Sequence, residues 1–239
     1  MSMKITRYKR DLDFSYALGA TLVFELLKNF PEKINRIFFK ENIKETDDIQ
    51  KIIKMSKEKG IEILHGDKPF NILSPKENCF VIAEFKKSYK NLDKEKSNIV
   101  LVNPSDAGNL GTIIRTAIGL GFNNIAIIRP AVDVFDPKTI RASMGAIFHI
   151  NIKYYNSFAE YQQEFSGHKC YAFMLKGASD FEKIEVKSPF SLVFGNESSG
   201  LPDEFAEICT SIKISQSSKI DSFSLPVAAA IAMYKFQQK

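Results

Sequence analysis

The pattern of apolar positions changes along the chain and is most regular after residue 98. From there on, short apolar runs rich in β-branched and aromatic residues alternate with stretches of helical periodicity. Such alternation is typical of a mostly parallel sheet whose two faces are covered by helices. We therefore predict an α/β domain over residues 98–239, with strands at "IVLV", "IAIIR", "HINIKYY", "CYAFML", "SLVFG" and "SIKIS".

Residues 1–97 predict a second, smaller α/β layer domain. The expected order is a helix over "SYALGATLVFELLKNF", a strand at "INRIFF", a helix around residues 46–59, and strands at "IEIL" and "CFVIAEF". The polar run "KKSYKNLDKEKSN", residues 86–98, has few apolar positions and ends where "IVLV" begins. We predict that this run links a domain of residues 1–97 to a domain of residues 98–239.

Polar loops after the predicted strands indicate where a ligand binds. In parallel sheets ligands bind beyond the carboxyl ends of the strands. The three loops there that are richest in small polar residues are residues 103–111, 195–200 and 215–224. The first contains neither GxGxxG nor a Gly-Lys-Ser/Thr sequence, so the two common phosphate-binding patterns are absent from it.

A helix predicted over residues 110–120 presents an arginine opposite its apolar face. At about 100° per residue, the apolar side chains gather on one side, and Arg115 falls on the other beside Gly111, Thr112 and Gly119. Small neighbours would let a substrate or another backbone approach Arg115 closely. An ordinary surface arginine is the alternative interpretation.

Two further polar residues have more than one interpretation. Glu197 lies in a turn after "LVFG" and is either a site residue or an ordinary loop carboxylate. Ser224 precedes Pro226 and an alanine-rich helix, where capping the helix and contacting a substrate are equally plausible.

The formal net charge of +5 comes entirely from residues 1–97. They contain 20 Lys and Arg against 15 Asp and Glu, whereas residues 98–239 contain 13 of each. The densest basic cluster is at the start of the chain: Lys4, Arg7, Lys9 and Arg10. This segment is either an arm that binds phosphate backbones or a solvated, frayed terminus.

The cysteines and histidines are too scattered to predict a disulfide framework or a zinc site. We expect reduced thiols and no metal at Cys79, Cys170, Cys209, His65, His149 and His168. The longest apolar stretch is too short to span a bilayer, and the first residues lack the apolar core of a signal peptide. A cytoplasmic protein is therefore expected, with no membrane partner.

Taken together, three segments resemble a known family. "NPSDAGNLGTIIRTA", "LVFGNESSGLP" and "IDSFSLPVAAAIAMY" are similar, in order and spacing, to the three motifs of the SpoU family of RNA ribose 2′-O-methyltransferases. "RASMGAIFHI" also resembles that family, so the similarity covers essentially all of residues 98–239. Residues 1–97 are more weakly similar to the small substrate-binding domain that many members carry ahead of the catalytic domain.

The resemblance implies a SPOUT-type α/β domain with a C-terminal trefoil knot, S-adenosylmethionine as cofactor and a homodimer. It implies an RNA substrate, with ribosomal RNA favoured over transfer RNA because of the additional domain. By the family's motifs, main-chain groups around Gly195, Ile214 and Phe223 would contact the methyl donor. The polar residues that match the family's active site are Asn109, Arg115, Glu197 and Ser222.

One position departs from the family's pattern. The family usually has Ser-Leu-Asn where this chain has Ser222-Phe223-Ser224, so Ser224 replaces an asparagine of the site. A protein that binds RNA but no longer methylates it is therefore an alternative, opposed by the presence of Asn109, Arg115 and Glu197. A nicotinamide-dependent oxidoreductase is disfavoured, because GxGxxG is missing and Arg129-Pro130 follows the second strand in place of an acid.

Overall fold

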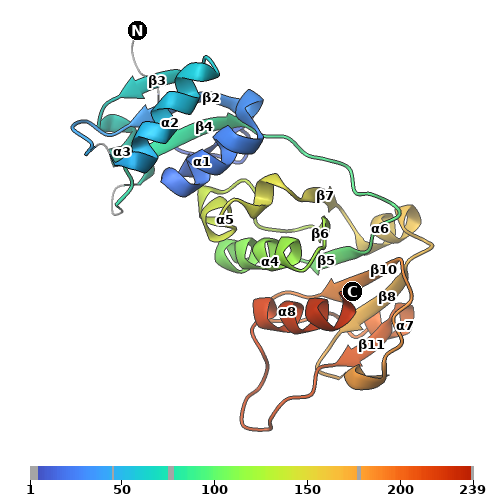
Figure 1. Cartoon of the computed structure of the whole chain (residues 1–239). Coiled ribbons are helices and arrows are strands. Elements are labelled where there is room, and N and C mark those ends of the chain that lie inside the picture. Colours follow the sequence, from blue (N-terminus) through green and yellow to red (C-terminus); the bar gives the residue numbers. More distant parts are fainter. Residues whose placement is uncertain (1–4, 45, 75–77, 177–178, 238–239) are drawn as a thin grey trace. The chain divides into compact units, whose positions relative to one another are not determined.

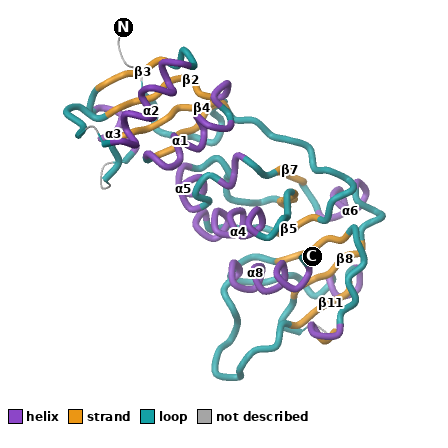
Figure 2. Tube along the Cα trace, in the orientation of Figure 1, coloured by secondary structure: helices purple, strands orange, loops and turns teal. Residues whose placement is uncertain are grey.

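A computed structural model of the chain describes all residues except 1–4, 45, 75–77, 177–178 and 238–239 (Figures 1 and 2). The chain forms two compact units. The first contains Met1–Ser88 and Asp133–Phe148, and the second contains Tyr89–Val132 and His149–Lys239. Residues 133–148, which our boundary at residue 97 assigns to the second domain, thus belong to the first unit.

The first unit is built on a four-stranded sheet in the order β1-β4-β2-β3. Strand β4 is antiparallel to β1 and β2, and β2 is parallel to β3. Helices α1 and α2 contact each other and the sheet. The elements are β1 (Phe14–Leu18), α1 (Ala20–Asn29), β2 (Ile34–Phe39), α2 (Asp47–Glu58), β3 (Glu62–His65), α3 (Lys68–Leu73) and β4 (Val81–Lys86).

The start of this unit corrects one prediction. We expected a helix from residue 15, but Phe14–Leu18 is a strand and the helix begins at Ala20. Gly19 separates them with φ at 105°, a conformation that residues with a side chain rarely adopt. The residues after Gly19 favour a helix, and the prediction wrongly extended that helix back across Gly19 to residue 15. The structure confirms α2 and the strands β2, β3 and β4, whereas α3 was not predicted.

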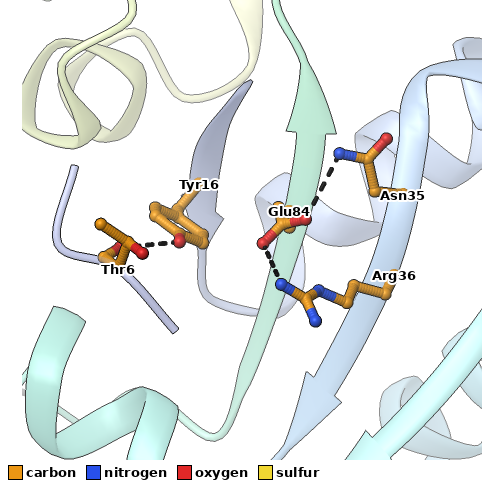
Figure 3. Close-up of polar contacts among 5 residues, drawn as sticks. All are labelled: Thr6, Tyr16, Asn35, Arg36 and Glu84. Carbon is orange, nitrogen blue, oxygen red and sulfur yellow. Dashed lines mark hydrogen bonds and ion pairs between the residues drawn. The ribbon is translucent and has the colours of Figure 1, made fainter. Parts of the chain in front are cut away.

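The basic segment at the start of the chain packs against the first unit from residue 5 onward. Ile5 and Tyr8 contact the apolar cluster around Tyr16 and Phe38. The Tyr16 hydroxyl donates to the carbonyl oxygen of Thr6 at 2.8 Å (Figure 3). Residues 5–13 are therefore a docked arm, and Arg7, Lys9 and Arg10 are exposed on it. Lys4 lies outside the described residues.

A buried carboxylate joins two strands of the first unit. Glu84 on β4 accepts hydrogen bonds from Arg36 at 2.7 Å and from Asn35 at 3.3 Å, both on β2 (Figure 3). Burial, helped by the negative charge of Glu84, raises the pKa of the nearby Tyr16 to about 12. Tyr16 is therefore a neutral hydrogen-bond donor throughout the physiological pH range.

Residues 133–148 complete the first unit through specific contacts. The Ser15 hydroxyl donates to the Phe135 carbonyl oxygen at 2.6 Å, and Tyr8 donates to the Asp133 carboxylate. The ring of Phe148 packs edge-on against Phe85, with centroids 5.4 Å apart. The segment carries helix α5 (Pro137–Ala142) and a 3₁₀ turn (Ala146–Phe148). It is thus part of the core of this unit.

The second unit is built on a seven-stranded sheet in the order β7-β6-β5-β10-β8-β11-β9, and all of its pairs are parallel. Its strands are β5 (Asn98–Val102), β6 (Asn124–Ile128), β7 (Asn151–Tyr155), β8 (Lys169–Phe173), β9 (Ser179–Asp180), β10 (Phe190–Phe194) and β11 (Thr210–Lys213). Its helices are α4 (Ala107–Gly119), α6 (Phe158–Glu164), α7 (Phe205–Ile208) and α8 (Leu225–Phe236). The predicted α/β architecture is confirmed, β9 was not predicted, and the trefoil knot stays a prediction.

Asparagines at the amino ends of three neighbouring strands form a buried ladder. Asn124 donates to Asn98 at 2.8 Å and Asn151 donates to Asn124 at 3.1 Å. Asn98 in turn donates to the hydroxyl of Tyr161 on α6. Because a buried amide without partners is costly, this ladder fixes the register of β5, β6 and β7 at the edge opposite the predicted site.

The cysteines correct a second prediction. Cys170 on β8 and Cys209, which ends α7, form a disulfide, although we expected reduced thiols. They are 39 residues apart, so no local spacing marked them as a pair, and adjacent packing of β8 and β11 brings them together. Cys79 is a buried thiol outside this disulfide, and its Sγ donates to the Val81 carbonyl oxygen at 3.3 Å.

The described part of the chain has neither a membrane-spanning helix nor a cluster of metal-binding side chains. Among the described residues, no helix is long and apolar enough to cross a membrane. The same residues contain no group of three or more His, Cys, Asp or Glu side chains placed to hold a metal ion.

Candidate active site

The predicted site loops meet because their strands are neighbours. Strands β5, β10, β8 and β11 are adjacent and parallel, so their carboxyl ends share one edge of the sheet. A cavity of about 310 Å³ lies there, between the loops after β8, β10 and β11 and the start of α8. It brings together five of the eight predicted site residues: Gly195, Glu197, Ile214, Ser222 and Phe223.

The turn after β10 closes tightly over Gly195. Asn196 and Gly200 form an isolated bridge, and a Cβ atom at residue 195 would lie 2.1 Å from the backbone carbon of Gly200. No side chain fits in that space, so the close approach requires glycine. The turn thereby places Asn196 and Glu197 at the wall of the cavity.

The Glu197 carboxylate is held by the loop that follows β5. One oxygen, Oε2, accepts from the backbone N–H and the hydroxyl of Ser105 at 3.0 and 2.8 Å. The other, Oε1, accepts from the backbone N–H of Asp106 at 3.1 Å. The first and second predicted loops are therefore joined through Glu197, and also through Asn196, whose amide donates to the Asn103 carbonyl oxygen at 2.8 Å.

Asn109 extends this arrangement into helix α4. Asp106 is the N-cap residue of the helix, and its side chain accepts from the Asn109 N–H at 2.7 Å. The Asn109 amide then donates to Glu197 Oε1 at 3.4 Å. Glu197 thus lies at the positive end of the helix dipole, which favours a negative charge.

These contacts keep Glu197 ionised. Burial alone would raise its pKa, but hydrogen bonds from the Ser105 side chain and from backbone N–H groups outweigh that effect. The pKa of Glu197 is consequently below its ordinary value. Both oxygens of this carboxylate already accept hydrogen bonds, and its lowered pKa makes it a poor proton acceptor. Glu197 is therefore better suited to hold the neighbouring loops in position than to take up a proton.

Arg115 lies on α4, outside the residues that line the cavity. The structure confirms the buried face at Leu110, Ile113, Ile114 and Ala117, and Arg115 is exposed opposite to it. Six residues separate Arg115 from Asn109, which corresponds to about 9 Å along a helix axis. Of its predicted small neighbours, Thr112 and Gly119 are exposed with it, whereas Gly111 is buried.

Ser224 occupies the N-cap position of α8, but its hydroxyl makes no capping hydrogen bond. The side chain is exposed and does not line the cavity, whereas its neighbours Ser222 and Phe223 do. Of the two interpretations of Ser224, side-chain capping is therefore wrong, and substrate contact stays a prediction.

Sequence reasoning missed the loop after β8 as part of the site. Met174, Leu175 and Lys176 line the cavity, and Lys176 pairs with Asp203 on the opposite loop at 3.3 Å. The segment "MLKG" has no distinctive composition. This loop is recognised as part of the site only because β8 lies between β10 and β11, and that strand order is known only from the structure.

The sequence matches two family models in the order of the two units. Residues 96–234 match the model of the SpoU rRNA methylase family, and residues 16–69 match the model for RNA 2′-O ribose methyltransferase substrate binding. The chain belongs to the SpoU rRNA methylase family. Enzymes of this family are S-adenosylmethionine-dependent RNA methyltransferases, so this chain is a methyltransferase whose cofactor is S-adenosylmethionine.

Similar proteins cover either the whole chain or its catalytic part. The Bacillus subtilis protein YacO, described as a TrmH family tRNA/rRNA methyltransferase, is 27% identical over 239 residues, which are 94% of this chain and 95% of that protein. RlmP of Bacillus subtilis, a 23S rRNA (guanosine(2553)-2′-O)-methyltransferase, is 32% identical over 132 residues, 54% of this chain and 53% of that protein. A crystal structure of an S-adenosylmethionine-bound rRNA methyltransferase from Sinorhizobium meliloti has a TM-score of 0.78 and 27% identity, covering 93% of this chain and 86% of that one.

The residues of the SpoU cavity fit S-adenosylmethionine. Its volume of about 310 Å³ is at the lower end of the range for small-molecule sites. The lining includes the apolar side chains Phe194, Leu201 and Ile212, which would be suitable walls for an adenine ring. Because residue 195 is glycine, no side-chain atom lies between its backbone and the backbone of Gly200.

Proposed function

We propose that this SpoU enzyme methylates a ribose 2′-hydroxyl of ribosomal RNA at the edge of the sheet where β5, β10, β8 and β11 end. The cavity lined by residues of the second and third motifs, to which Glu197 joins the loop of the first motif, supports the proposal most directly. Gly195, Ile214 and Phe223 would hold the cofactor there. When bound, S-adenosylmethionine would supply a methyl group on a sulfonium: the ribose oxygen would form the new O–C bond, S-adenosylhomocysteine would leave as the S–C bond breaks, and the hydroxyl proton would pass to an adjacent RNA phosphate.

Glu197 is assigned a positioning role. Its carboxylate joins the loop after β10 to Ser105, Asp106 and Asn109, and its pKa is lowered, so it takes up a proton poorly at neutral pH. Without this carboxylate, the backbone N–H groups of Ser105 and Asp106 would lose their acceptor. The start of α4, and with it Asn109, would then lose its fixed position.

Arg115 is assigned to the RNA. A guanidinium stays protonated in proteins, so it serves poorly as a general base. It can hold an RNA phosphate and favour the ionised form of the attacking hydroxyl through its positive charge. Its exposed position on α4, outside the cavity, agrees with a contact to a macromolecular substrate.

The finer parts of the proposal concern substrate and assembly. Ribosomal RNA is favoured over transfer RNA because a substrate-binding region precedes the catalytic one, and because RlmP and the Sinorhizobium meliloti neighbour are named for ribosomal RNA. We further propose a homodimer, a cytoplasmic location and a reaction that needs no metal ion. Light scattering that gives a mass near the 27.0 kDa of one chain at micromolar concentration would contradict the dimer.

The central test replaces Arg115. Arg115→Ala should lower methyl transfer to RNA by at least a hundredfold, while S-adenosylmethionine binds nearly as before, because the cavity lining is unchanged. Transfer of a tritiated methyl group measures the first quantity and calorimetry the second. Lys169→Ala, which removes an exposed charge at the start of β8 and thus at the opposite edge of the sheet, is the matched control. Near-normal turnover in Arg115→Ala would remove this residue from the site.

The target is identified by mapping ribose methylation in RNA from cells with and without the gene. One ribosomal position that loses its methyl group, and regains it when the gene is restored, is the expected result. Loss confined to transfer RNA would replace ribosomal RNA as the proposed substrate.

A further inference from the structure

The first unit contains a pocket that is separate from the cofactor cavity. It has a volume of about 410 Å³, and the docked arm, the end of β1, the end of α3 and helix α5 line it. All of these elements belong to the same compact unit. The substrate-binding model spans residues 16–69, and of the described lining residues Leu18 alone lies within that range.

The inner part of this pocket is apolar and has a fixed aromatic wall. Leu18 and Leu73 line the pocket and are half-buried. Tyr8 forms the wall, and its position is set by its hydrogen bond to Asp133 and by Lys87, whose ammonium lies 4.6 Å from the ring centroid. A flat apolar group can therefore enter without first ordering the aromatic side chain.

The rim of the pocket is positively charged. Arg7 on the arm and Lys138 and Arg141 on α5 are all exposed there. Lys138 and Arg141 are three residues apart, so they lie on the same face of the helix. Asp136 is the one acid among the described lining residues, and its carboxylate is engaged as the N-cap of α5 by the Lys138 N–H at 2.8 Å.

We propose that this pocket binds one unpaired nucleotide of the substrate RNA. A flat base would pack against Tyr8 and Leu73, and the flanking phosphates would contact Lys138, Arg141 and Arg7. In a double helix the bases are stacked and paired, so only an unpaired nucleotide presents a free base together with its phosphates. This inference rests on the proposed RNA substrate and adds a second contact point, outside the catalytic unit.

The test measures binding of the full chain to three labelled probes in the absence of S-adenosylmethionine. The probes are a short oligouridylate, an abasic strand of equal length and charge, and an RNA duplex of that length. Oligouridylate should bind about tenfold more tightly than the abasic strand, a difference of about 1.4 kcal/mol, because the abasic strand has no base to stack on Tyr8. It should also bind more tightly than the duplex.

A double variant tests the rim. Lys138→Ala with Arg141→Ala should weaken oligouridylate binding and lower the log–log salt slope by about 1.4, since each lost phosphate contact removes about 0.7 for a single strand. The matched control is Lys51→Ala with Lys54→Ala, two exposed lysines on α2 that do not line the pocket. The control should keep the slope and the affinity of the intact chain.

Three outcomes would overturn the proposal. Equal affinity for abasic and base-bearing strands would show a charged surface without a base pocket, and preference for the duplex would show docking of a helix. An equal loss in both double variants would show a diffuse positive field. Methyl transfer and S-adenosylmethionine binding are measured separately, so a chain without transferase activity would remove the proposed function without deciding whether this pocket binds nucleotides.

Discussion

The side chain that connects most of the site is Glu197, although it is the least distinctive part of its motif. Its partners Ser105 and Asp106 are 92 and 91 residues away in the sequence. The sequence alone left Glu197 as either a loop carboxylate or a site residue, because a glutamate in a turn has many structural uses. Only the adjacency of β5 and β10 shows that it joins two loops.

The lowered pKa of Glu197 predicts how stability depends on pH. A carboxyl group with a lower pKa in the folded chain stabilises it above the unfolded pKa of about 4.3, and this contribution is lost as the pH falls through the folded value. Glu197→Gln should therefore reduce the free energy of unfolding by about 1 kcal/mol at neutral pH. The glutamine replaces one acceptor oxygen by an NH₂ group, which cannot accept a hydrogen bond from a backbone N–H. The deficit should shrink below pH 4.

Urea unfolding of both proteins across the pH range measures this difference. Glu207→Gln, at an exposed carboxylate on α7, should change stability little at any pH. A deficit of Glu197→Gln that stays constant down to pH 3 would contradict the assignment of the lowered pKa to Glu197.

At the level of elements, the apolar pattern predicted most strands and both long helices of the second unit. The strands were recognisable because buried parallel strands are nearly continuous apolar runs. The pattern failed where one residue decides the backbone, as at Gly19, and where the run is very short, as at β9. It also gave no signal for the Cys170–Cys209 pair, because contact across a sheet has no local pattern.

The disulfide predicts a redox-dependent stability of the second unit. It closes a loop of 39 residues, for which the chain-entropy model gives about 4 kcal/mol of stabilisation as an upper value. A reductant should therefore lower the urea midpoint of the intact chain. The variant with both Cys170→Ser and Cys209→Ser should have the lower midpoint already and should not respond to reductant. Equal midpoints of the intact chain with and without reductant would show that the bond contributes nothing.

At the level of the whole molecule, residues 133–148 were the part that the sequence placed least well. Part of this segment resembles the SpoU catalytic region in sequence. In the folded chain, however, the whole segment packs in the first unit. The polar run between β4 and β5 is likewise only partly a linker, because Leu92 is buried in the core of the second unit and Asp93 bonds with Asn124.

This arrangement predicts that the second unit tolerates truncation poorly. A fragment of residues 89–239 would expose Phe135, Ile140 and Phe148, which the intact chain buries. It should bind a hydrophobic dye strongly and aggregate. The control fragment omits residues 133–148 as well and joins 132 to 149 by a short Gly/Ser linker. It should bind little dye and keep its affinity for S-adenosylmethionine. A well-dispersed 89–239 fragment without dye binding would show that the segment does not depend on the first unit.

The return of residues 133–148 to the first unit also sets an order of events during translation. A ribosome that has released residue 88 has released every strand of the four-stranded sheet, but not the segment that covers β1. Sixty more residues must follow, which takes roughly 3 to 12 seconds at 5 to 20 residues per second. During that interval the apolar surface of β1 that residues 133–148 will cover stays exposed, while β5, α4 and β6 are synthesised. The first unit can therefore be completed only after the first three elements of the second unit have been synthesised.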